Sequence, residues 1–338
     1  MDPHRQKKPA LNSENRKPRI EILDAWRGLA ALSVCFYHFG RGLPDGFFKE
    51  ACTFGNLGVD VFFVISGFVI PLWLDRAGGS WGDIPLFLWK RFIRLYPAFL
   101  FASLCSLGLW WGSGLIPGFR GEPVGISGTG ALANLFFLCD IVGQPWIVPV
   151  SWSLAIEWQY YLAAAVSFFF LCRSTPAWRL VTIVLWILAS FIPLGKQWLP
   201  AYGGVFALGF VSFLHWKGEL SRKAFLLLAL LAGAAHGAQF GAAAGFIGVS
   251  AALGMLVPWR GPASLRFLGE ISYSLYLTHV LIGGRVINLG LRFPEEWPTR
   301  SLFFFTALAG SIFFAWGFYK IVEKPSHLAS QKIKAKAD

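Results

Sequence analysis

The chain has 338 residues, of which 55% are hydrophobic, 17% aromatic and only 14% charged. A soluble protein carries about a quarter charged residues, so the composition excludes an ordinary soluble domain and is typical of a polytopic membrane protein. The net charge of +12 would suggest nucleic-acid binding in a soluble chain. In a membrane protein, however, the positions of Lys and Arg report orientation. We therefore expect the lipid bilayer, and no nucleic acid, as a partner.

Ten apolar segments approach the roughly 20 residues that are needed to cross the hydrocarbon. We predict membrane spans at residues 24–42, 57–75, 91–113, 152–172, 178–195, 200–216, 223–238, 240–257, 267–288 and 301–321. The expected fold is an all-α membrane protein, a bundle of about ten transmembrane helices. Its single membrane domain covers 22–326, between a basic tail at 1–21 and a short tail at 327–338. The polar start of the chain does not resemble a secretory signal peptide.

One further segment, 130–147, is ambiguous because it is short and contains Asp140. If it does not cross, 23 of the 30 Lys and Arg residues lie on one side of the membrane. If it crossed, twelve of those charges would move to the other side. The positive-inside rule therefore favours a re-entrant or surface segment. It also predicts an integral inner-membrane protein with both termini in the cytoplasm.

The cysteines give no sign of metal or disulfide chemistry. They form no CxxC pair and no metal-ligand spacing, and most lie in apolar segments. The five are Cys35, Cys52, Cys105, Cys139 and Cys172. We interpret them as small hydrophobic residues and expect no bound metal.

The first span contains two ionisable residues, Arg27 and His38. Such residues are expensive in a bilayer and are usually functional. Eleven residues make about three helical turns, so both lie on one face, about 16 Å apart. In the predicted topology Arg27 is near the cytoplasmic surface and His38 is in the outer half. Arg27 either helps to bind a phosphorylated donor substrate or pairs with Asp24.

Two carboxylates are predicted to reach a depth similar to that of His38. Asp60 opens the second span and Glu157 lies in the first turns of the fourth. Either one is a candidate to orient a histidine or to hold its charged form. The alternative for Glu157 is a structural pair with an Arg or His of another span.

A cluster of three cations, Lys90, Arg91 and Arg94, opens the third span at the cytoplasmic mouth. Arginine binds phosphate oxygens through two parallel hydrogen bonds, so the cluster is a candidate phosphate site. The alternative is that these side chains only anchor the helix at the lipid headgroups. Tyr96 follows in the same segment.

The ninth span carries Tyr276 and His279. A lone histidine in an apolar helix is usually a hydrogen-bonded core residue. We therefore keep both as secondary candidates.

Taken in order, the motifs LDAWRGLAALSVCFYHF, GVDVFFVISGFVI, KRFIRLYP, SWSLAIEWQYYL, ISYSLYLTH and VEKPS resemble those of the acyltransferase 3 family of integral-membrane O-acyltransferases. They cover residues 22 to about 326, and the short remainder resembles the stand-alone form of the family.

The resemblance implies a ten-span enzyme that moves an acyl group, usually acetyl, from acyl-CoA to a hydroxyl of a carbohydrate or glycosylated acceptor. It implies that His38 is the catalytic histidine, with Arg27 as its motif partner. Arg91 and Arg94 would help to hold the CoA phosphates, and Glu157 occupies the position of the family's motif glutamate.

Two other classes compete with this interpretation. Intramembrane His, Asp and Glu also form proton relays in transporters, but transporters often have paired halves with interrupted helices. No such internal symmetry is visible. A non-catalytic scaffold or receptor would leave the buried ionisable residues without a role.

Overall fold

The computed structural model describes residues 21–76, 82–115, 125–168 and 175–333, and the regular elements in these ranges are helical. The predicted basic tail lies outside the described residues except for Glu21, and so does the end of the C-terminal tail beyond residue 333.

Each of the ten predicted spans coincides with a helix to within several residues. These helices are α1 (Glu21–Gly40), α3 (Gly58–Arg76), α4 (Asp83–Gly114), α7 (Trp152–Phe168), α8 (Pro176–Ala189), α9 (Gly203–Trp216), α10 (Arg222–Phe240), α11 (Ala242–Gly254), α13 (Ser272–Gly290) and α14 (Trp297–Phe318). The connecting elements are α2 (Phe47–Thr53), η2 (Phe54–Leu57), α5 (Gly128–Leu135), α6 (Cys139–Val142), η3 (Pro149–Ser151), η5 (Leu199–Tyr202), α12 (Ala263–Glu270), the π-helix η6 (Tyr319–Glu323) and α15 (Lys324–Lys332).

Within the described ranges, five helical stretches are long and apolar enough to cross a membrane. They are Phe47–Arg76, Asp83–Gly114, Leu199–Trp216, Arg222–Phe240 and Trp297–Lys332. Helices α8 and α11 are apolar but shorter. The outer faces of several helices expose large apolar side chains, such as Trp111 at 75% and Phe313 at 74%. Exposed apolar surface on this scale indicates contact with lipid.

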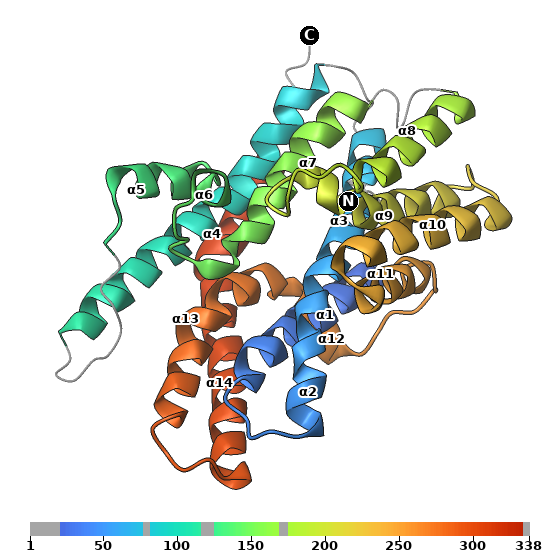
Figure 1. Cartoon of the computed structure of the whole chain (residues 1–338). Helices are drawn as coiled ribbons and strands as arrows, with labels where there is room; N and C mark the ends of the chain where they lie inside the picture. The colour runs from blue at the N-terminus through green and yellow to red at the C-terminus, as the bar shows by residue number, and fades with distance from the viewer. Residues whose placement is uncertain (1–20, 77–81, 116–124, 169–174, 334–338) are drawn as a thin grey trace, which may run out of the picture.

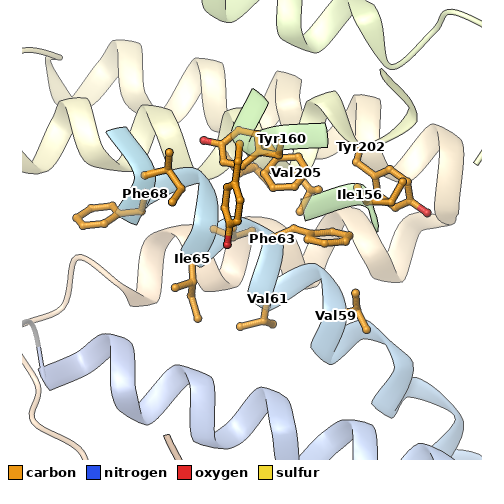
Figure 2. Packing of buried hydrophobic residues seen from close by; sticks show 14 of the residues in the cluster. Val59, Val61, Phe63, Ile65, Phe68, Ile156, Tyr160, Tyr202 and Val205 are labelled. Atoms are coloured by element: carbon orange, nitrogen blue, oxygen red, sulfur yellow. The ribbon is translucent and has the colours of Figure 1, made fainter. Parts of the chain in front are cut away.

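Helix α3 forms the centre of the core. Its side chains pack against α9, α7 and η5 (Figure 2). The ring of Phe63 lies 5.2 Å from that of Tyr202 and 5.0 Å from that of Phe206, measured between centroids. The Tyr160 ring stacks on Phe206 at 4.0 Å. These aromatic contacts fix α3 against the neighbouring helices.

Two glycines allow α3 and α9 to approach closely. A Cβ atom on Gly67 would lie 2.4 Å from the Phe206 carbonyl oxygen, and one on Gly209 would lie 2.1 Å from the Val64 carbonyl oxygen. A side chain at either position would therefore collide with backbone. Small residues at such crossings are typical of membrane helices.

The ambiguous segment 130–147 contains only the short helices α5 and α6, which lie at one edge of the molecule beside α4 (Figure 1). Eight residues of helix extend about 12 Å, far less than the roughly 30 Å hydrocarbon core. The buried Asn134 side chain closes the segment, because it bonds to the Gly130 and Pro145 carbonyls and accepts the Ile147 N–H. Neither helix is long enough to cross.

Three boundaries differ from the predictions. Helix α4 begins at Asp83 rather than 91, so the cation cluster lies inside it and not in its first turn. The ninth predicted span is two helices, α12 and α13, which meet at Ile271. The predicted tail from 327 is instead the continuation of α15, which packs against α4. Hydropathy locates apolar segments, but it does not detect the polar helical segments that extend them or pack beside them.

Candidate active site

A cavity of about 560 Å³ lies between α1, α3, α4, α7, the α12–α13 pair and the η6–α15 segment. Such a volume is within the range of small-molecule sites. Its ionisable lining is rich in both signs of charge. The basic residues are Arg27, Arg76, Arg91, Arg94 and His327, and the acidic ones are Asp24, Glu157, Glu270 and Glu323.

The arginines come from different helices and converge on this cavity. Arg91 and Arg94 lie one turn apart on α4, as the sequence predicts. Arg27 reaches the same cavity from α1 and interacts electrostatically with Arg94, Asp24 and Glu157. Asp24 is therefore one of several charges near Arg27 and not its exclusive partner.

Arg91 is held in place by aromatic rings. It is only 8% exposed, and its guanidinium lies 5.5 Å from the ring centroid of Phe87 and 5.6 Å from that of Tyr161. Cation–π contacts of this kind are strongest where water is excluded. They keep one face of the guanidinium fixed while the cavity remains open to it.

Lys90 differs from its two neighbours. Its ammonium lies 5.6 Å from the centroid of the Trp73 ring, and it is not among the described residues that line the cavity. Residue 90 lies about 100° around the helix from residue 91, with residue 94 between them, so Lys90 is at the edge of this face. The predicted grouping of three cations therefore reduces to two, which are joined by Arg27 and by Arg76, a residue that the sequence interpretation did not single out.

Glu157 is a hydrogen-bonded member of this cavity. One oxygen of its carboxylate accepts the Ser66 hydroxyl at 2.8 Å and the Tyr161 hydroxyl at 2.5 Å. Two hydroxyl donors on one carboxylate oxygen fix the position of the side chain, because hydrogen bonds to an ionised acceptor are strong. Glu157 thus lies with the arginines of this cavity, whereas His38 is outside the described lining.

Glu323 was not singled out from the sequence, although it belongs to the VEKPS motif. It is buried, and its carboxylate accepts the Ser274 backbone N–H at 3.1 Å and the Ser274 hydroxyl. It occupies the last position of the π-helix η6, and π-turns are frequent at functional sites. The available signal was a glutamate directly after an apolar span.

Two further cavity residues, His327 and Gln331, come from α15. Their side-chain nitrogens lie 2.7 Å apart. Both belong to the predicted tail at 327–338, and the sequence does not single out either one. Nothing in a single sequence indicates that α15 packs against α4.

His38 lies outside the described cavity lining. It is half-buried, and its ring centroid is 4.9 Å from that of His279 on α13 and 5.0 Å from that of Tyr37. Tyr276, one helical turn before His279, does line the cavity. The pair of histidines therefore lies one layer of side chains beyond the cavity wall.

Asp60 has a different partner from the predicted one. Its carboxylate lies 3.1 Å from Nε2 of His236 on α10, and both residues are buried. The sequence does not single out His236. The structure thus gives His38, Asp60 and Glu157 separate bonding or ring-contact partners among the described residues.

The two candidate tyrosines also separate. Tyr276 is buried, its hydroxyl lies 2.6 Å from the Ser153 hydroxyl, and it donates to the Val150 carbonyl at 3.0 Å. Tyr96 donates to the Leu135 carbonyl at 2.9 Å and stacks on Phe92. Tyr96 therefore attaches α5 to α4 and is not part of the described lining. Within the described chain, no group of three or more His, Cys, Asp or Glu is placed to hold a metal ion.

Comparison with known proteins decides the class of this site. Residues 20–320 match the profile of the Acyl_transf_3 family, an acyltransferase domain. The chain belongs to the acyltransferase 3 family. It is accordingly an acyltransferase. The buried ionisable residues can therefore be explained without assuming a transporter or a scaffold.

Two curated relatives are informative. The acyltransferase MdmB of Streptomyces mycarofaciens is 27% identical over 346 residues, which cover 85% of each chain. The O-acetyltransferase OatA of Staphylococcus aureus (strain NCTC 8325 / PS 47) is 33% identical over 187 residues, 51% of this chain but 28% of OatA. No solved structure matches.

Proposed function

We propose that this acyltransferase moves an acyl group, most simply acetyl, from acyl-CoA to a hydroxyl of a carbohydrate or glycosylated acceptor. The observation that carries the donor assignment is the cluster of arginines in one cavity. CoA is a polyphosphate, and arginine is the side chain best suited to bind phosphate oxygens through paired hydrogen bonds. The relative OatA, named as an O-acetyltransferase, supports acetyl transfer to oxygen.

The negative charges of the cavity fit the same assignment. Without a ligand, Arg27, Arg91 and Arg94 would repel one another across the cavity. Glu157 and Glu323 interact electrostatically with these arginines and offset part of that repulsion. An anionic donor would neutralise the remaining positive charge of the arginines when it binds.

We propose that His38 acts as the general base. It takes the proton of the acceptor hydroxyl while the oxygen attacks the thioester carbonyl carbon, and a new C–O bond forms. The C–S bond then breaks, and the CoA thiolate takes the proton back from the imidazolium. Histidine suits this role because its charge changes near neutral pH. Tyr276 and His279 separate the cavity from His38, so the acyl end of the donor must reach this layer.

In the proposed topology, ten helices cross the inner membrane and both termini lie in the cytoplasm. Helices α5 and α6 lie at the outer surface of that membrane. The membrane domain would then extend from residue 22 to the end of α15. With this orientation the arginine cavity opens toward cytoplasmic CoA, and His38 lies nearer the outer side, where an acceptor would arrive.

The donor site is tested by comparing Arg94→Ala with Lys90→Ala, two cations on the same helix. Arg94 lines the cavity, and Lys90 lies on Trp73. We expect Arg94→Ala to weaken acetyl-CoA binding at least tenfold, which corresponds to about 1.4 kcal/mol. Lys90→Ala should leave it unchanged. Calorimetric titration of the purified protein in detergent measures both, and equal effects of the two substitutions would contradict the assignment.

His38→Ala is the matching test of chemistry. It should bind acetyl-CoA like the wild type, because His38 lies outside the cavity lining. Only a small residual thioester cleavage should remain. Unchanged cleavage by this variant would remove His38 from the mechanism.

A further inference from the structure

The second histidine of the pair, His279, is held in a single orientation. It is fully buried, and its Nδ1 lies 2.8 Å from the Tyr276 carbonyl oxygen and 3.1 Å from the Leu275 carbonyl oxygen. A carbonyl oxygen only accepts, so Nδ1 must carry the hydrogen. The two carbonyls belong to the preceding turn of α13, and they fix both the tautomer and the direction of the ring.

The other ring nitrogen of His279 is consequently an acceptor, and it has no hydrogen-bond partner among the described residues. A buried acceptor without a partner is uncommon in folded proteins and calls for an explanation. The bonds to the Leu275 and Tyr276 carbonyls use only Nδ1, so they do not explain why Nε2 is present.

The neighbour that can use this acceptor is His38. The two ring centroids are 4.9 Å apart with an angle of 57° between the planes, and α1 packs against α13. The ring centroids of Phe39 and Tyr276 lie 6.1 Å each from that of His279, whereas His38 is half-buried and interacts electrostatically with Arg41. His38 carries a ring N–H that can donate a hydrogen bond to Nε2 of His279.

We propose that His279 is a positioning residue for His38. Its Nε2 accepts one ring N–H of His38, so that the other nitrogen of His38 faces the acceptor hydroxyl with its lone pair. When His38 takes up the hydroxyl proton, the same bond stabilises the imidazolium. A neutral imidazole thereby takes the part that a carboxylate plays in a Ser-His-Asp arrangement. This inference rests on the proposed role of His38 as the base.

Two amide substitutions separate this role from a structural one. Asparagine at 279 can place an amide nitrogen near the position of Nδ1 and keep the bonds to Leu275 and Tyr276. Glutamine is longer and can place its amide oxygen near the position of Nε2. If His279 positions His38, His279→Gln should retain more thioester cleavage than His279→Asn. If His279 only supports the helix, the order is reversed.

The readout is release of the CoA thiol from acetyl-CoA by the full chain in lipid nanodiscs, with water as the acceptor. We expect His279→Asn to lower kcat at least a hundredfold and to leave the KM for acetyl-CoA unchanged. His279→Gln should remain within about tenfold of the wild type. Thr278→Val is the matched control, because Thr278 is equally buried on α13 and bonds only to the Ser274 carbonyl. It should keep the wild-type kcat.

A double substitution keeps the proposal testable if the asparagine variant does not fold. A residue that acts through His38 has nothing to position in a His38→Ala background. There, His279→Gln should cause no further loss of the residual cleavage. Additive losses, or wild-type kcat in His279→Asn, would overturn the role of His279. Wild-type activity of His38→Ala alone would instead overturn the proposed function.

Discussion

At the scale of single residues, the informative positions are ionisable groups buried in apolar helices. The sequence identifies them because each is expensive in a membrane. It does not identify their partners. Asp60 illustrates this, because its depth matches that of His38 while its carboxylate meets His236 on a helix 176 positions away along the chain.

We expect Asp60→Ala to act on stability and not on chemistry. Removal of one partner leaves the buried His236 Nε2 without its hydrogen bond, which typically costs about 1–3 kcal/mol. Thermal unfolding in detergent should show this loss. Acetyl-CoA cleavage per folded molecule should stay near the wild-type value.

The double variant Asp60→Ala/His236→Ala provides the control. Its destabilisation should be smaller than the sum of the single losses, because the two residues bond to each other. A stable Asp60→Ala protein without activity would restore Asp60 to the catalytic role inferred from the sequence.

At the scale of helices, packing at glycine positions decides how closely elements approach. We expect Gly67→Ala to destabilise the protein by about 1–3 kcal/mol. The added Cβ would lie 2.4 Å from a backbone oxygen of α9, and backbone does not move aside as a flexible side chain does. The measurement is the unfolding midpoint in detergent.

Gly108→Ala on α4 is the matched control for this substitution. No atom lies within 4 Å of a Cβ built there, and alanine favours the helix by up to about 1 kcal/mol. Stability should therefore stay equal or rise. An equal loss in both variants would show that helix geometry, and not the α3–α9 contact, is responsible.

Helix ends also carry functional consequences that hydropathy misses. The break between α12 and α13 at Ile271 and the π-helix that precedes α15 bring Glu270, Glu323 and His327 to the cavity. None of these residues was a predicted site residue. Their placement depends on small backbone irregularities, which a periodic pattern of apolar residues does not specify.

At the scale of the whole molecule, the distribution of Lys and Arg predicts the orientation. In a chain whose native cysteines are replaced by alanine, single cysteines at Gly128, Glu295 and Ala329 test it. All three positions are exposed. A membrane-impermeant maleimide applied to intact cells should label residues 128 and 295. It should label residue 329 only after permeabilisation.

Residue 295 decides whether the segment of α5 and α6 crosses. A crossing segment would invert every later loop, so residue 295 would be protected while residue 128 remained labelled. Labelling of residue 329 in intact cells would contradict the cytoplasmic placement of the C-terminus.

The sequence by itself determined the membrane class, the approximate position of ten helices, the family, and which ionisable residues to examine. Apolar length and motif order are local properties, so one chain suffices to read them. The tertiary structure decided which of these residues meet. It separated Lys90 from Arg91 and Arg94, moved Glu157 to the arginines, gave Asp60 to His236 and placed His279 against His38. Helical periodicity fixes the face of a helix on which a side chain lies. Only packing between helices fixes which other face lies opposite to it.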